Sequence, residues 1–134
     1  MSDDDSHGAA MLDVVASLMR FYARHGDVLA ALRSVLPQML QHLSVEAGSL
    51  FLSTADQKFL ECVVCHGPVD IVGMKLPLDS GLVGRVYQHG RAELVHNTNT
   101  DLAHRKSIDA ATGFVTRSTA TAPVSFADQR FGVM

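Results

Sequence analysis

The sequence predicts an α+β fold in which two N-terminal helices precede an antiparallel sheet of about six strands. Residues 9–44 carry apolar side chains at helical spacing, whereas short segments after residue 47 alternate between apolar and polar residues, as strands do. The chain has 134 residues, of which 47% are hydrophobic, so it has material for one core and no room for a second. We expect a single domain over residues 9–134, with helices over 9–44 and a sheet domain over 47–134.

The helical part is predicted to follow a short disordered lead over residues 1–8, which contribute nothing to a core. Gly26 is placed to end the first helix, and Asp27 to cap the second. Pro37 lies within the second helix, where an interior proline predicts a kink or a break. The apolar stripes on which both helices depend consist of Met11, Leu12, Val15, Leu18, Met19 and Tyr22, followed by Val28, Leu29, Leu32, Val35, Leu36, Met39, Leu40 and Leu43.

The sheet part begins with an antiparallel hairpin, because two strand-like segments flank a turn-like stretch over residues 54–58. A short helix capped by Asp79 and Ser80 and ended by Gly90 is expected between later strands. The long connection over 97–117 is where we expect function to lie. The predicted strands cover residues 48–53, 59–66, 74–78, 92–96 and 118–126, and a sixth begins at Phe131.

Charge and composition exclude several classes of function. The formal net charge is −3 and the isoelectric point is near 6.1, so nothing attracts the chain to nucleic acid or to an anionic membrane surface. The acidic start is unlike a signal peptide, and no apolar run is long enough to cross a bilayer. We therefore expect a cytoplasmic protein. Its two cysteines, Cys62 and Cys65, are too few for a disulfide framework.

Four segments in order carry a family resemblance. A strand over 47–52 follows the long helix, Gly81-Leu82-Val83-Gly84 opens the short helix, Gly90 and Asn97 bracket the next strand, and the run Asp109-Ala110-Ala111-Thr112-Gly113-Phe114-Val115-Thr116-Arg117-Ser118 comes last. Together they resemble the GAF family, the sensor modules of cyclic-nucleotide phosphodiesterases, adenylate cyclases and histidine kinases. The resemblance spans residues 27–134, and the last run is its most specific element. It implies a GAF/PAS-like sheet, with the N-terminal helices on one face and short helices and a long loop covering a pocket on the other.

The resemblance implies a regulatory domain that binds a small molecule, either a cyclic nucleotide or another small metabolite. The positions that match the family's pocket are Ser49, Leu82, Val83, Asp109, Thr112 and Thr116, and His66 is added as a candidate near that pocket. A helix that begins near Gly81 would offer backbone N–H groups to an anionic ligand group. The implied partners are a second copy through the N-terminal helices, where Met11 and Met19 would form the seam, and a separate effector domain of a larger protein.

Three departures weaken the cyclic-nucleotide interpretation. Cyclic-nucleotide binders tend to carry an aromatic and an acidic residue at the position of Cys65-His66-Gly67. The residue that would stack on the base and the residue that would hydrogen-bond to it are therefore missing. The fifth strand carries Thr119-Ala120-Thr121-Ala122 in place of larger apolar residues, which widens the expected pocket. The family's N-K-F-D-E motif would lie beyond the last residue, so the resemblance implies a chain truncated before its last strand is complete.

Other interpretations of the same residues stay open. Asp109 could cap a local turn, with Thr112 and Thr116 bonded to loop backbone. Cys62-Val63-Val64-Cys65-His66 has the C-x-x-C-H spacing of haem attachment, but residues three apart in a regular strand face opposite sides of a sheet, which argues against shared haem or zinc. We therefore predict no metal ligands and no catalytic residues.

Two alternative functions remain. One is an enzyme similar to GAF-type free methionine sulfoxide reductases, for which Cys65 would supply the thiol, although Cys62 is expected to face away from it. The other is a dimerisation scaffold that binds no ligand.

Overall fold

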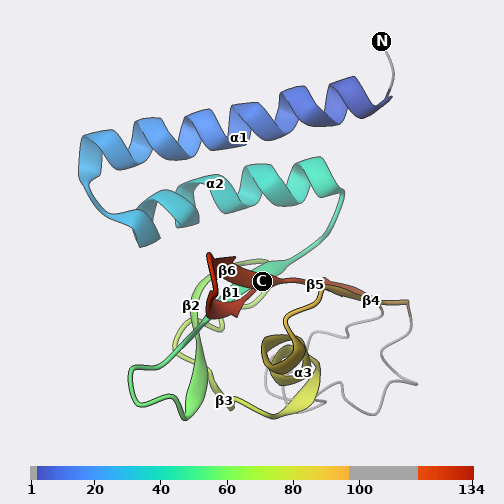
Figure 1. The fold of residues 1–134 in the computed structure, drawn as a ribbon. Helices are drawn as coiled ribbons and strands as arrows, with labels where there is room; N and C mark the ends of the chain where they lie inside the picture. The colour runs from blue at the N-terminus through green and yellow to red at the C-terminus, as the bar shows by residue number, and fades with distance from the viewer. Residues whose placement is uncertain (1–2, 97–117) are drawn as a thin grey trace.

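The computed structural model describes residues 3–96 and 118–134. Two helices, α1 (Asp3–His25) and α2 (Val28–Leu43), come first in the chain. Figure 1 shows α1 lying over α2, α2 lying over the sheet, and a third helix, α3 (Gly81–His89), on the other side of that sheet. The predicted α+β fold, with the N-terminal helices on one face, is therefore confirmed.

The junction between α1 and α2 forms as the sequence predicts. Gly26 adopts the left-handed conformation, with φ of 67°, and its N–H donates to the carbonyl of Tyr22. Asp27 then caps α2, since its carboxylate accepts a 3.1 Å hydrogen bond from the N–H of Ala30.

Two details of the helices differ from the sequence-based expectation. Helix α1 begins at Asp3, so most of the predicted disordered lead is helical; acidic residues favour the first turn of a helix because of its dipole. Helix α2 runs without a break through Pro37, because the apolar face on both sides of the proline is held against the sheet.

The strands form two antiparallel sheets. The larger has the order β3-β2-β1-β7-β6 and the smaller pairs β4 with β5. Their bounds are β1 Gly48–Ser53, β2 Phe59–His66, β3 Lys75–Pro77, β4 Glu93–Val95, β5 Thr119–Thr121, β6 Pro123–Phe126 and β7 Gln129–Val133. The predicted segments are all present, and the structure divides the predicted fifth strand into β5 and β6.

That division occurs at Ala122 and Pro123, where the chain leaves the small sheet and joins the large one. The N–H of Ala122 donates to the carbonyl of Met134, and the N–H of Met134 donates back to Ala122. Thr121 is the buried residue on β5, whereas Ala120 and Ala122 are exposed. The alanine-bearing face of this strand is therefore the outer one, since Thr119 and Thr121 are the more buried side chains.

The core lies on both faces of the large sheet. On one face, Leu36 and Leu40 of α2 pack against Leu50 and Val64. On the other face, one cluster contains Phe51, Leu60, Cys62 and Leu76, and a second joins Leu82 and Val86 of α3 to Val133. The face that carries α3 is the one on which the resemblance places a ligand.

Candidate functional site

Helix α3 begins at a turn that requires glycine. Gly81 has a φ of 68°, and a Cβ atom at Gly84 would lie 2.8 Å from the carbonyl carbon of Asp79. The first turn of α3 therefore lies directly against the preceding loop. Ser80 occupies the N-cap position, and Gly90, with φ of 71°, ends the helix, so the predicted boundaries of this helix are confirmed.

Two of the predicted pocket residues lie on this helix and face the sheet. Leu82 is buried with Val86 and Val133, and Val83 packs against both clusters on this face. Their side chains join α3 to the strands, which is the packing role expected of apolar residues at helical spacing.

Ser49 lies on the same side of the sheet as α3, whereas His66 does not. Ser49 on β1 is directly opposite Cys65 on β2, and Cys65 packs against the cluster below α3. His66 is opposite Gly48, whose missing Cβ would point at the side chain of Leu40 in α2. The exposed His66 is therefore on the α2 side, apart from Ser49, Leu82 and Val83.

The three remaining predicted site residues, Asp109, Thr112 and Thr116, lie outside the described residues. The segment over residues 97–117, which is predicted to cover the pocket, also lies outside them. The ligand pocket formed by these residues stays a prediction.

A β-bulge between β1 and β2 changes the expected orientation of the cysteines. Leu50 is opposite Val64 but Phe51 is opposite Cys62, so Val63 is an extra residue on β2. The extra residue reverses the alternation, and Cys62 and Cys65 come to lie on the same face, in one apolar cluster. The expectation that they face opposite sides is wrong, because that argument assumed a regular strand.

The two thiols differ in exposure and surroundings. Cys62 is 1% exposed, and its pKa is raised to about 12, first by burial and then by the neighbouring Cys65 thiol. The Cys62 Sγ donates to the carbonyl of Val64 at 3.6 Å. Cys65 is half-buried; its Sγ donates to Asp70 Oδ1 and accepts from the N–H of Ile71, both at 3.4 Å.

Cys65 opens onto a shallow hollow of about 240 Å³ between α2 and the loop that joins β2 to β3. Arg33 of α2 and Asp70 of the loop carry its two opposite charges. The pKa of Asp70 is lowered, first by the hydrogen bond that it accepts from the N–H of Val72 and then by that from Cys65. Sequence reasoning missed this hollow because its lining residues come from α2 and from the end of β2 with the loop after it, which are far apart in the sequence.

Neither haem nor a metal ion fits the cysteine pair. The pair shares a face, but Cys62 is too deeply buried to form a thioether with a bulky macrocycle. Within residues 3–96 and 118–134, no three histidine, cysteine or acidic side chains gather in a way that could hold a metal ion. Among the same residues no helix is both long and apolar enough to span a membrane.

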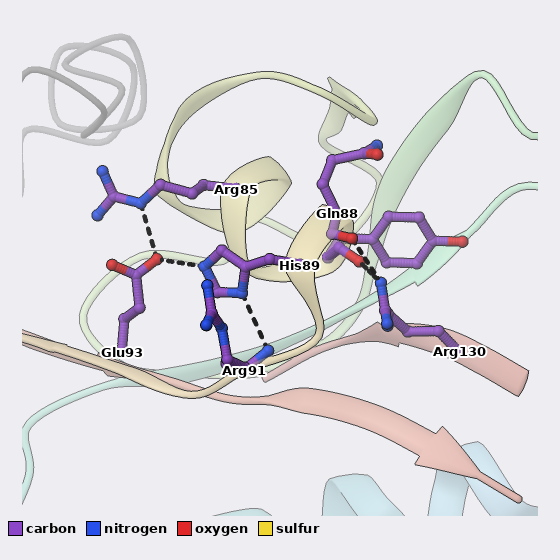
Figure 2. A network of polar contacts seen from close by, with 7 residues as sticks. Arg85, Gln88, His89, Arg91, Glu93 and Arg130 are labelled. Atoms are coloured by element: carbon purple, nitrogen blue, oxygen red, sulfur yellow. Dashed lines mark hydrogen bonds and ion pairs between the residues drawn. The ribbon is translucent and has the colours of Figure 1, made fainter. Parts of the chain in front are cut away.

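A polar network holds the C-terminal end of α3 to β4 (Figure 2). Glu93 Oε2 accepts from Arg85 Nε at 2.7 Å and lies 2.9 Å from His89 Nε2. His89 Nδ1 accepts from the N–H of Arg91 at 3.0 Å, so Nε2 carries the proton of the neutral ring and donates it to Glu93. These contacts fix the ring and tie the last turn of α3 to the small sheet.

Arg130 of β7 closes the same end of α3 from the opposite side. Its Nη1 donates to the carbonyl of Gln88 at 2.9 Å and also to that of Tyr87, and its guanidinium lies 6.0 Å from the Tyr87 ring centre. A cation at these carbonyls also complements the negative end of the helix dipole. A side chain at Gly90 would collide with Arg130, so the left-handed glycine also makes room for this cap.

Replacing Glu93 by glutamine is expected to destabilise the domain slightly at neutral pH. The pKa of Glu93 is lowered in the folded state, first by the hydrogen bond from Arg85 and then by that from His89. This stabilisation is present above the unfolded pKa of about 4.5 and disappears as the pH falls through the lower folded pKa. For a partly exposed pair we expect a loss of about 0.5 kcal/mol at pH 7.

Urea unfolding of the wild type and of Glu93→Gln at pH 7 and pH 3 measures this effect. The gap in unfolding free energy between the two proteins should shrink at pH 3. A gap that stays constant with pH would contradict the contribution of the ionised carboxylate.

Solved structures similar to this chain identify its architecture. The GAF domain of a phosphoenolpyruvate-protein phosphotransferase from Coxiella burnetii is 16% identical and superposes with a TM-score of 0.79 over 93% of this chain and 75% of that one. The chain has the fold of a GAF domain. A second GAF domain, from an Acinetobacter phosphoenolpyruvate-protein phosphotransferase, is 20% identical, with a TM-score of 0.75 over 99% of this chain and 76% of the other.

The GAF fold also includes enzymes. Free methionine-R-sulfoxide reductase from Neisseria meningitidis, solved with its substrate, is 18% identical to this chain, with a TM-score of 0.73 over 99% of this chain and 74% of the reductase. No protein-family model and no curated protein matches the sequence. Similarity at this level of identity establishes the fold, and function has to be argued from the residues of this chain.

Proposed function

We propose that this GAF domain is a regulatory sensor that binds a small anionic molecule on the α3 face of its sheet. The observation that carries the proposal is that Ser49 and the first turn of α3 lie on one side of the sheet. Gly81 adds no side chain at the start of that turn, and Gly84 lets the turn pack against the loop before it. A carboxylate or a phosphate, including that of a cyclic nucleotide, suits the positive end of a helix.

The effect of ligand binding would be transmitted through the contacts of α3. A ligand that binds at its first turn favours one position of the helix, and the polar network at its other end connects it to β4 and β7. The output would belong to a separate effector domain.

Thermal unfolding with a panel of cyclic nucleotides and small carboxylates and phosphates tests this proposal. A true ligand at one hundred times its dissociation constant should stabilise the domain by about 2.7 kcal/mol. Ser49→Ala and Gly81→Ala should reduce the shift, whereas Ser34→Ala, an exposed change on α2, should leave it unchanged. If no compound shifts the unfolding temperature, or if Gly81→Ala leaves the shift intact, the proposed site is wrong.

We also propose that two copies associate through α1. One side of this helix exposes large apolar side chains that α2 does not cover, with Leu12 at 70% and Met19 at 65% exposure. The full set is Met11, Leu12, Val15, Met19 and Tyr22. Residues 12, 15, 19 and 22 are separated by three, four and three positions, which is the heptad spacing of paired helices. So much exposed apolar surface on one helix favours a helical partner over water.

Charge placed on this surface should separate the copies. Leu12→Glu combined with Met19→Glu is expected to convert a dimer to a monomer, because both charges would be buried in the contact. Sedimentation velocity measures the change. Val28→Glu, an exposed apolar position at the start of α2, serves as the matched control. A wild type that sediments as a monomer at high concentration would refute the proposal.

A reductase is the second candidate. The bulge supports it, because the bulge places Cys62 and Cys65 on one face, whereas the sequence-based expectation placed them on opposite faces. Cys65 at the hollow and Cys62 behind it form a dithiol, and reduction of a sulfoxide consumes two thiols. Turnover of free methionine sulfoxide by the wild type, lost in Cys65→Ser, would support this candidate. Absence of turnover in the wild type with an ample supply of reductant would eliminate it.

A further inference from the structure

The bulge on β2 creates an unequal pair of thiols that the proposed ligand site does not use. Cys62 and Cys65 pack in one apolar cluster, and the Cys65 thiol lies close enough to Cys62 to raise its pKa. Cys65 lines an open hollow, whereas Cys62 is enclosed by Phe51, Leu60 and Leu76. A small solute can therefore reach one sulfur of the pair far more easily than the other.

The groups around Cys65 suit a reaction at its sulfur. The N–H of Ile71 donates to Sγ and Asp70 Oδ1 accepts from the thiol, so the two contacts hold the sulfur in one orientation at the hollow. Asp70 is held by the N–H of Val72 at 2.9 Å. Arg33, which also lines the hollow, is a cation facing the same carboxylate.

We propose that Cys62 and Cys65 form an oxidant-responsive pair in which a hydroperoxide oxidises Cys65 from the hollow and Cys62 then closes a disulfide across the bulge. In the first step the Cys65 sulfur attacks the outer peroxide oxygen, the O–O bond breaks, and the leaving oxygen takes the thiol proton as water or an alcohol. Cys65 becomes a sulfenic acid, and the peroxide is reduced by two electrons.

In the second step the Cys62 sulfur attacks the oxidised Cys65 sulfur. The S–S bond forms, the S–OH bond breaks, and the hydroxide leaves as water with the proton from Cys62. The charged groups that act on Cys62 are Cys65 and Asp70, and burial dominates over both. Because Cys62 is almost entirely protonated at pH 7, this step is slow and accelerates as the pH rises.

Disulfide closure requires the two strand positions to come closer than residues three apart in an extended strand. The bulge is where β2 can contract, since Val63 has no partner on β1 at that point. Contraction would pull on the loop that forms the hollow and on the pairing of Cys65 with Ser49. Oxidation would thus alter the sheet face beside the proposed ligand site.

One equivalent of hydrogen peroxide added to the reduced protein, followed by mass spectrometry of alkylated peptides, tests the proposal. The expected product links Cys62 to Cys65 within one chain and loses two hydrogen atoms. In Cys62→Ala a dione reagent should trap the sulfenic acid on Cys65. Cys65→Ser should retain a reduced Cys62. Oxidation of Cys62 in that variant, or cross-linking between chains alone, would overturn the proposal.

The pH dependence of the wild type provides a second measurement that does not depend on the variants folding. The rate of disulfide formation after the burst of sulfenic acid should rise about tenfold per pH unit between pH 7 and 9, because the Cys62 thiolate fraction rises tenfold. A second step independent of pH would exclude Cys62 as the resolving thiol. Arg33→Ala should change only the first step, since Arg33 acts at the hollow.

Discussion

Gly132→Ala is expected to destabilise the domain by about 4 kcal/mol, which is a large part of the stability of an ordinary domain. Gly132 lies on β7, opposite Leu52 of β1, and a Cβ atom there would lie 1.9 Å from the carbonyl oxygen of Phe51. Neither backbone can move away without breaking the pairing of β1 with β7. Because β7 lies between β1 and β6, the added methyl group would split the large sheet.

Urea unfolding followed by circular dichroism measures this loss. The matched control is Gly8→Ala, an exposed position within α1 where a new Cβ meets nothing within 4 Å. Alanine there should raise stability by about 0.5 to 1 kcal/mol, because it favours the helix. If Gly132→Ala unfolds at the same urea concentration as the wild type, β1 and β7 do not approach as closely as described.

Leu60→Ala is expected to lower the free energy of unfolding by about 3 kcal/mol. Leu60 is fully buried on β2, opposite Ser53 on one side and Leu76 on the other. Truncation removes apolar contacts and leaves a cavity that two paired strands cannot collapse into. For a domain of this size we expect the midpoint of thermal unfolding to fall by about 10 °C.

Differential scanning calorimetry provides the measurement, with Leu94→Ala as the matched control. Leu94→Ala is the same chemical change at a position on β4 that is 64% exposed. This substitution should therefore change the free energy of unfolding by less than about 0.5 kcal/mol. Equal losses for both variants would contradict the placement of Leu60 at the centre of the core.

Local sequence signals predicted most elements because each depends on a few neighbouring residues. Gly26, Asp27 and Gly90 mark helix boundaries through backbone conformation and capping, and each does so in the structure. Of the kink or break expected at Pro37, the break does not occur, because the tertiary packing of α2 outweighs the local cost of proline. Local rules also did not indicate that the predicted fifth strand is shared between two sheets.

The candidate site was less predictable than the fold. Ser49 and the start of α3 come to one face, as the resemblance implies, whereas His66 lies on the other. The orientation of Cys65 depends on an extra residue in the pairing of two strands. The residue pattern within β2 does not indicate this orientation of Cys65, since the bulge is a property of the strand pair. Arg130 was missed for a similar reason: its partners are backbone carbonyls, which carry no sequence signal.

The crossing of the chain at Ala122 couples two parts of the domain mechanically. β5 and β6 are consecutive stretches of one backbone, so the small sheet cannot be displaced without pulling on the outermost strand of the large sheet. Met134, the residue after β7, holds that junction with two backbone hydrogen bonds to Ala122. A displacement of β4 and β5 would therefore be transmitted through the backbone to the large sheet beneath α2. This transmission would not require side chains to rearrange.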